Sequence, residues 1–391
     1  MSFAYKQACN GQGREYGYRD EPDIDPLLLW SIVLLLAFGL VMVYSASGPV
    51  AITHGLPDTY FLARQSVFLC IGGVLALLVF TLSTDYWRLW APLFFWLGLI
   101  PLILVLVPGV GVELNGAKRW INLGVVNIQP SEITKLLALL YAAAFCVRRR
   151  DVMDDTSRVF WPMVGATALV GGLLVLEPDF GAFVVICTIT FGVLFLGGIT
   201  IRPLLLSGVW LGGIFALLIW YSDYRRARLL AFLDPWKDQH DGGYQLTNSL
   251  IAFGNGEIFG AGLGASVGKE FLPEAYNDFL FAVIGEEFGF IGVLVVVCLF
   301  ALMVHRAFAV GREAQQRERY FPALAAMGVA IWFGIQGLIN MLVNVGLLPT
   351  KGLTLPLMSF GGSSLVTSCI AAAVLLRVDW ENRQLARGKK L

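Results

Sequence analysis

Long runs of uncharged, apolar residues dominate this chain of 391 residues. An α-helix needs roughly 20 such residues to cross a bilayer. The runs that approach or exceed this length cover 27–46, 66–82, 89–112, 159–176, 180–201, 203–221 and 321–348. Weaker spans begin near Ser131, Phe279 and Leu365, with polar residues at or just before each start. Because 57% of the residues are hydrophobic and only 14% are charged, the sequence predicts an all-α integral membrane protein with about ten transmembrane helices.

Basic residues gather in alternate connections, although the formal net charge is zero. They cluster at residues 148–158, 305–319 and 377–390. Cytoplasmic loops carry an excess of Lys and Arg, so these clusters predict that both termini are cytoplasmic, which agrees with an even number of spans. The longest connection, the glycine-rich segment 222–277 between the seventh and eighth helices, is then an extracytoplasmic loop.

The organisation predicted along the chain is simple. Residues 1–26 form a polar cytoplasmic leader that we expect to be disordered, 27–378 form one polytopic membrane domain, and 379–391 form a basic cytoplasmic tail. The cysteines lack close metal-ligand spacing, so we expect neither disulfides nor zinc. No nucleic-acid partner is expected.

Asp278 stands where a polar loop becomes an apolar run. One interpretation is a helix cap, in which Asn277 or Asp278 accepts hydrogen bonds from the first turn and the charge favours the positive end of the helix dipole. The other is a general base, because an acid at the edge of an apolar region is kept basic by desolvation while a substrate hydroxyl can still reach it. The two interpretations are compatible.

Glu286 and Glu287 lie two turns further along the same predicted helix, roughly 12 Å along its axis. Acids at membrane depth are costly unless they are paired. Residues seven or eight apart share a helix face, so we expect Glu286 to face approximately as Asp278 does. These acids either form structural hydrogen bonds or ion pairs, or support a site at Asp278.

Glu132 and Lys135 are three residues apart at the start of the fourth span, a spacing at which helical side chains form ion pairs. The pair is either structural, or Lys135 meets an anionic group such as a lipid phosphate while Glu132 positions it. Lys118 and Arg119 add cations to the outward face, where the positive-inside bias predicts few.

Two further polar features lie near the end of the chain. Gln336, Asn340 and Asn344 recur every four residues, a pattern typical of interhelical hydrogen bonding. Segment 348–364 contains two prolines and three glycines, so it cannot be helical throughout, and such backbone is tolerated at membrane depth only against protein or an aqueous cavity. Its end, Gly361-Gly-Ser-Ser, enters a helix and can cradle an anion, although that motif alone is weak.

Together these segments resemble the SEDS family (shape, elongation, division and sporulation) of polytopic peptidoglycan polymerases. The residues that carry the resemblance are 115–121, 129–132, 232–236, 243–246, 272–275, 277–279, 349–356 and 359–364. Residues 351–355 and 234–236 look like the division branch and less like the elongation branch. The chain departs from the family pattern at Asn277, where Thr or Ser is expected, at Phe360, where Tyr is usual, and at Glu177, where Gln is more common.

The resemblance implies that the substrate is lipid II, which is polymerised into β-1,4 glycan strands during septal cell-wall synthesis. It implies that Asp278 is the general base and that polyprenyl pyrophosphate is the leaving group, with a divalent cation, Mg²⁺ or Mn²⁺, bound to the pyrophosphate; the sequence identifies no metal ligand. The residues then expected to bind substrate are Glu132, Lys135, Lys118, Arg119, Lys351 and Ser363. Glu286 and Glu287 would support the site.

The resemblance also implies partners and a location. The partners are membrane lipids, a class B penicillin-binding protein of the FtsI type, and other division proteins of the FtsQ, FtsL and FtsB types. The location is the bacterial cytoplasmic (inner) membrane at the division septum. A lipid II transporter, an elongation-type polymerase and a scaffold without chemistry are the alternatives. The absence of paired repeats with broken helices in both halves counts against the transporter.

Overall fold

The structure, a computed structural model, describes residues 22–389 apart from 115–116, 123, 125, 154, 222–225, 227–231, 238, 240–241 and 351. Most of the predicted leader, and the expected site residue Lys351, therefore lie outside the described residues. The helices are α1 (Pro26–Thr53), α2 (Tyr60–Thr81), α3 (Thr84–Leu106), α4 (Pro130–Arg148), α5 (Thr156–Leu176), α6 (Phe180–Leu196), α7 (Ile201–Trp220), α9 (Tyr244–Gly256), α10 (Gly268–Phe271), α11 (Leu280–Gln316), α12 (Tyr320–Asn344) and α13 (Gly362–Ala386).

The prediction of a helical membrane protein is confirmed. Within the described residues, 8 helices are long and apolar enough to cross a membrane, and α6 is a shorter apolar helix. The apolar helix α7 spans 20 residues. Large apolar side chains such as Leu77, Leu89 and Val209 are exposed on the outside of the bundle, which is how a lipid-facing surface is built.

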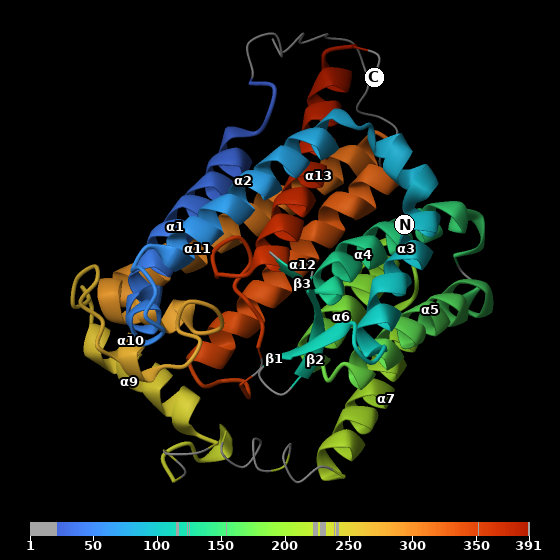
Figure 1. Cartoon of the computed structure of the whole chain (residues 1–391). Helices are drawn as coiled ribbons and strands as arrows, with labels where there is room; N and C mark the ends of the chain where they lie inside the picture. Colours follow the sequence, from blue (N-terminus) through green and yellow to red (C-terminus); the bar gives the residue numbers. More distant parts are fainter. Residues whose placement is uncertain are drawn as a thin grey trace.

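Helix α12 is the centre of the bundle. It packs against α4, α6, α11 and α13, while α1 and α2 cover α11 and α13 on one side (Figure 1). Small residues on α12, including Ala325, Gly328 and Ala330, are buried, and small residues allow helices to approach closely in a membrane. The central position of α12 explains why its polar stripe can reach several other elements.

A small antiparallel sheet lies at one end of the bundle, and the prediction of an all-α fold missed it. Strand β1 (Gly111–Leu114) pairs with β2 (Ala117–Asn122), which pairs with β3 (Asn127–Ile128). We call this end of the molecule the sheet end. Residues 117–122 alternate only weakly between apolar and polar, so no clear strand period marks them in the sequence.

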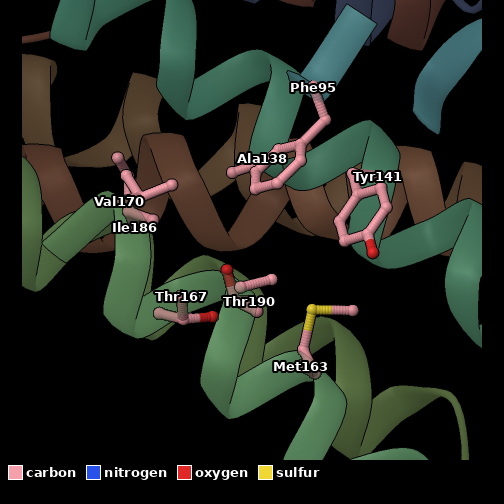
Figure 2. Close-up of a pocket in the computed structure, with 9 residues that line it drawn as sticks. Phe95, Ala138, Tyr141, Met163, Thr167, Val170, Ile186 and Thr190 are labelled. Carbon is pink, nitrogen blue, oxygen red and sulfur yellow. The ribbon is translucent and has the colours of Figure 1, made fainter. Parts of the chain in front are cut away.

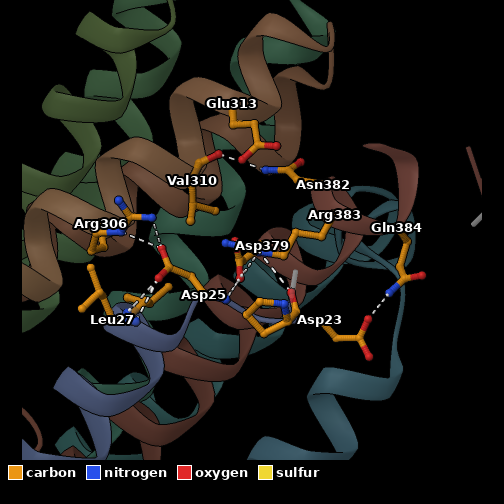
Figure 3. Close-up of polar contacts among 12 residues, drawn as sticks. Asp23, Asp25, Leu27, Arg306, Val310, Glu313, Asp379, Asn382, Arg383 and Gln384 are labelled. Carbon is orange, nitrogen blue, oxygen red and sulfur yellow. Dashed lines mark hydrogen bonds and ion pairs between the residues drawn. The ribbon is translucent and has the colours of Figure 1, made fainter. Parts of the chain in front are cut away.

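The basic clusters predicted to share one side of the membrane do share one end of the molecule, which we call the basic end. There Asp25 accepts a hydrogen bond from Arg306 Nε at 2.6 Å and its own N–H donates to Asp379 (Figure 3). Arg150 donates to the hydroxyl of Tyr320 at 2.6 Å. Residues 22–25 and the end of α13 therefore lie together, as an even number of spans requires.

Helix α11 is broken at Gly289, whose φ of 64° and ψ of −160° are not helical. Segment 257–262, which we call the bridging segment, fills the break. The N–H groups of Ala261 and Gly262 donate to the carbonyls of Glu286 and Glu287 at 2.9 and 3.0 Å, and the N–H of Phe290 donates to the carbonyl of Glu257 at 2.9 Å. The bridging segment thus satisfies backbone groups that the break leaves without helical partners.

A narrow apolar gap separates α3 and α4 from α5 and α6. Phe95, Tyr141, Met163 and the hydroxyl-bearing Thr167 and Thr190 surround it (Figure 2). The gap is too narrow to admit a water molecule. It is a packing feature of the bundle and has no access for a ligand.

Candidate functional site

A polar pocket of about 510 Å³ lies at the sheet end, within the usual range for ligand sites. It is formed where seven parts of the chain meet: the start of α2, the sheet, the start of α4, the α5–α6 connection, the start of α9, the loop before α11, and segment 348–364 with the start of α13. Its lining includes Arg64, Arg119, Gln129, Glu132, Asp179, Glu274, Asn277, Asp278, Gly352, Thr354, Ser363 and Ser364.

Asp278 lines this pocket, but it is not a helix cap. Helix α11 begins at Leu280, its N-cap residue is Phe279, and no side chain of its own caps it. The capping comes from another helix, since Asn344 Oδ1 accepts a hydrogen bond from the N–H of Ala282 at 3.1 Å. The carboxylate of Asp278 is thereby left free of a capping role.

The polar stripe on α12 fixes the backbone of Asp278. Asn340 Nδ2 and Asn344 Nδ2 donate to the carbonyl of Asp278 at 2.9 and 3.0 Å. Asn340 Nδ2 also donates to the carbonyl of Leu353 at 2.6 Å. Both amide side chains are buried. These bonds join Asp278 to the irregular segment before α13, while the bond between Asn344 and Ala282 of α11 is a predicted interhelical hydrogen bond.

The carboxylate of Asp278 lies directly against the backbone at Gly352. A Cβ atom added to Gly352 would lie 3.0 Å from Asp278 Oδ2, closer than ordinary van der Waals contact. Among the described residues, no hydrogen bond or ion pair to this carboxylate is formed. An acid that is held by its backbone and has an open carboxylate is arranged to accept a proton.

The electrostatic surroundings keep Asp278 basic. Burial, followed by the charge of Glu274, raises its pKa to about 7, while the charge of Arg119 opposes this shift. Burial also raises the pKa of the neighbouring Tyr276. A pKa close to the working pH suits general-base catalysis.

Glu132 and Lys135 form the predicted ion pair, with 2.8 Å between Lys135 Nζ and Glu132 Oε1. Lys135 is fully buried, donates also to Gln336 Oε1 at 2.9 Å, and lies 5.5 Å from the centre of the Trp332 ring. Lys135 does not line the pocket, whereas Glu132 does. The structure therefore places Glu132 at the pocket wall, with Lys135 behind it.

The two expected cations on β2, Arg119 and Lys118, differ in whether they line the pocket. Arg119, on β2, lines the pocket and donates through Nη2 to the carbonyl of Pro178 at 2.7 Å. Lys118, the preceding residue, donates to the carbonyl of Val107 at 3.2 Å and is not part of the lining. Of these two neighbouring cations, Arg119 is therefore the one placed to act on a ligand in the pocket.

Ser363 lines the pocket at the first turn of α13, beside Gly361, Gly362 and Ser364. Its Oγ accepts a hydrogen bond from the N–H of Gln129 at 2.9 Å. A hydroxyl that accepts one bond still has a hydrogen to donate. Together with the unpaired N–H groups of a helix start, this wall is suited to an anion.

Glu286 and Glu287 are buried away from the pocket, so the expectation that Glu286 faces as Asp278 does is wrong. Glu286 accepts hydrogen bonds from Ser266 Oγ and from the N–H of Gly268 at 3.1 Å. Glu287 accepts one from Ser45 Oγ at 2.5 Å and lies 3.4 Å from Lys269 Nζ. The helical spacing between Asp278 and Glu286 does not predict a shared face, because α11 starts two residues after Asp278. Both acids hold the loop before α11 in place.

The pocket contains oxygen atoms that fit a hard cation. Glu132 Oε2 is buried and has no hydrogen-bond partner among the described residues. Across all the residues that the structure describes, there is no cluster of three or more His, Cys, Asp or Glu side chains that could hold a metal by itself. Mg²⁺ commonly takes one or two carboxylates and completes its shell with water and substrate phosphates. These residues therefore fit a cation that binds with a phosphate-bearing substrate.

Arg64, Gln129 and Asp179 are among the polar pocket residues that were not predicted as site residues. Asp179 accepts hydrogen bonds from Gln129 Nε2 at 3.1 Å and from Ser131 Oγ at 2.8 Å, and it caps α6 through the N–H of Ala182. Its position after a proline in a short connection was the available signal. The sequence contains no signal that Arg64 belongs to a site, because a single cation at the start of a span is also typical of an interfacial anchor.

Comparison with known proteins identifies relatives over nearly the whole chain. The FtsW, RodA and SpoVE family, described as "Cell cycle protein", matches residues 26–384. A "Probable peptidoglycan glycosyltransferase FtsW" from Aromatoleum aromaticum is 56% identical over 372 residues, covering 94% of this chain and 90% of that protein. The protein of the same name from Burkholderia thailandensis is 51% identical over 380 residues, covering 94% and 81%.

Solved structures agree with these relatives. One chain of a peptidoglycan synthase complex, described for its coordination of polymerization and crosslinking, matches with a TM-score of 0.76 and 32% identity over 92% of this chain and 98% of that chain. The rod shape determining protein RodA of Thermus thermophilus matches with a TM-score of 0.67 and 31% identity, over 91% and 96%.

Proposed function

The chain belongs to the FtsW, RodA and SpoVE family and is a multi-pass membrane peptidoglycan glycosyltransferase, and we propose that Asp278 is the general base with which it polymerises lipid II. The observation that carries this proposal is the geometry of Asp278. Its carbonyl is fixed by two buried amides, its carboxylate opens into the pocket, and its pKa is raised to about 7.

The proposed reaction is a single displacement. The carboxylate of Asp278 takes the proton from the 4-hydroxyl of the acceptor sugar while that oxygen bonds to the anomeric carbon of the donor. The bond from this carbon to the pyrophosphate breaks, and polyprenyl pyrophosphate leaves with the electron pair. One displacement inverts the anomeric centre, as in inverting glycosidases, so the product is a β-1,4 glycan.

The leaving group needs charge neutralisation more than it needs a proton. Arg119 on β2, Arg64 on α2 and Ser363 in the first turn of α13 line the pocket and would bind the pyrophosphate. A divalent cation held in part by Glu132 would supply further positive charge to the phosphate oxygens. Lys135 would keep the Glu132 carboxylate oriented.

The experiment is polymerisation by the purified full chain together with a class B penicillin-binding protein, supplied with lipid II and Mg²⁺ or Mn²⁺. We expect glycan strands from the parent. Asp278→Asn should lower the rate by about 10²–10⁴-fold, the usual worth of a general base. Asp85→Asn removes an exposed acid at the basic end and serves as the matched control with the parental rate.

Different outcomes separate the alternatives. Polymer from Asp278→Asn at the parental rate would exclude Asp278 as the base. Translocation of lipid II across vesicles without polymer would support a transporter. We expect chelation of divalent cations to stop polymerisation, and addition of Mg²⁺ or Mn²⁺ to restore it. Polymerisation that continues unchanged after chelation would show that the cation is not required.

The partner and the location are part of the proposal. The structural likeness to a chain of a peptidoglycan synthase complex supports a class B penicillin-binding protein as the partner. The similarity to proteins named FtsW supports a role at the division septum, in the cytoplasmic membrane with the basic end inside. Co-purification from detergent and imaging of a fluorescent fusion in dividing cells test these two points.

A further inference from the structure

Glu177, in the connection between α5 and α6, has a buried carboxyl group. The residue is 0% exposed, and neither carboxyl oxygen has a hydrogen-bond partner among the described residues. An ionised carboxylate in such a place costs a large desolvation free energy, so the group is expected to bind a proton instead. This is also the position where Glu replaces the Gln that is more common in the family.

Two charged groups act on this carboxyl among the described residues: Asp179 in the same connection and Arg119 on β2. Burial is the largest effect and the charge of Asp179 adds to it, whereas Arg119 opposes both; together they raise the pKa of Glu177 to about 8. At neutral pH the carboxyl of Glu177 is therefore mostly protonated.

Arg119 binds the backbone beside this carboxyl. Its Nε donates to the carbonyl of Glu177 at 3.3 Å, and its Nη2 donates to the carbonyl of Pro178 at 2.7 Å. Its Nη1 lies 4.0 Å from Asp179 Oδ1. The guanidinium is thus held mainly by neutral carbonyls, so much of its positive charge remains available to the pocket that it lines.

We propose that Glu177 is a positioning residue that must be neutral for Arg119 to serve the pocket. The proposal rests on the proposed function, because the anion that Arg119 would meet is the substrate's pyrophosphate. When Glu177 loses its proton, a second carboxylate stands beside the guanidinium. That carboxylate draws Arg119 from the pocket and cancels its charge there, so anionic substrate binds less well.

Glu177→Gln tests this directly, because the amide has nearly the same shape and cannot ionise. The measurement is kcat/KM for lipid II across about pH 6.5 to about pH 9.5. In the parent, kcat/KM should fall at alkaline pH, approaching the tenfold per pH unit that a single ionisation gives. In Glu177→Gln this alkaline fall should move to higher pH, while the rate near pH 7 stays close to that of the parent.

Glu113→Gln is the control, since Glu113 is an exposed acid on β1 of the same sheet; its profile should match the parent. An unchanged alkaline fall in Glu177→Gln would overturn the positioning role alone. A parent that forms no polymer would overturn the proposed function, and the positioning role with it.

Thermal unfolding gives a second readout that needs no substrate. The folded-state pKa of Glu177 is raised, so the parent should lose stability relative to Glu177→Gln as the pH rises from about 5 to about 8, with no further divergence above that range. A melting-temperature difference that is independent of pH would show that Glu177 is not a buried neutral acid and would overturn the proposal.

Discussion

Asp278 joins two properties at one residue: its carboxylate lines a pocket, and burial among protein atoms raises its pKa. Because its pKa is raised to about 7, the ionised form is lost as pH falls through that value. We expect kcat/KM for lipid II to fall about tenfold per pH unit on the acidic side of pH 7. An acidic limb centred near pH 4, the ordinary range for Asp, would contradict this assignment.

Gly352 provides the space for the base. A methyl group at this position would lie 3.0 Å from Asp278 Oδ2, so Gly352→Ala should displace the carboxylate and lower kcat by about 10²-fold, the effect expected when a catalytic group is misplaced by about 1 Å. Gly254→Ala is the control, because nothing lies within 4 Å of its added methyl. Equal rates from both variants would show that the carboxylate does not depend on Gly352.

At the scale of elements, the polar stripe of α12 was predictable and the start of α11 was not. The spacing of Gln336, Asn340 and Asn344 indicated interhelical hydrogen bonds, which Gln336 and Asn344 form, and the spacing of Glu132 and Lys135 indicated an ion pair, which is present. The start of α11 was misjudged because its cap comes from Asn344, more than sixty residues away in the sequence. Local sequence patterns contain no information on such a cap.

The cap from α12 leads to a prediction about Asn344. Asn344→Ala removes the acceptor for the N–H of Ala282 and one donor to the carbonyl of Asp278. Leaving a buried group without its partner costs about 1–3 kcal/mol, so we expect a lower melting temperature and a reduced polymerisation rate. Gly334→Ala on the same helix adds a methyl at ordinary contact distance and should change neither. A fully active, fully stable Asn344→Ala would show that α11 needs no such cap.

At the scale of the whole molecule, hydropathy and loop charge predicted the helical bundle and the common end of the basic clusters. The pocket itself could not be predicted, because it is assembled from seven parts of the chain whose contacts depend on helix packing. The sheet was missed for a related reason: its strands are short and are defined by pairing with one another.

The basic end should contribute to stability through Arg306. Arg306→Ala leaves the buried Asp25 without its ionic partner, and breaking such a pair costs about 3 kcal/mol. Thermal unfolding in detergent measures this loss. Arg312→Ala, at an exposed position on the same helix, should stay within about 0.5 kcal/mol of the parent. Similar melting temperatures for the two variants would contradict a stabilising role for the cluster.

The break in α11 has a consequence for amide hydrogen exchange. The N–H groups of Ala261, Gly262, Phe290 and Ile291 are satisfied between the bridging segment and α11, so all of them must lose protection together when the bridging segment separates. An unbroken helix would instead show protection that declines gradually from its end. Exchange followed by mass spectrometry should therefore find one cooperative opening unit that spans two stretches of sequence. The short first part of α11, which follows Asp278, would then open with the loop and not with the rest of its own helix.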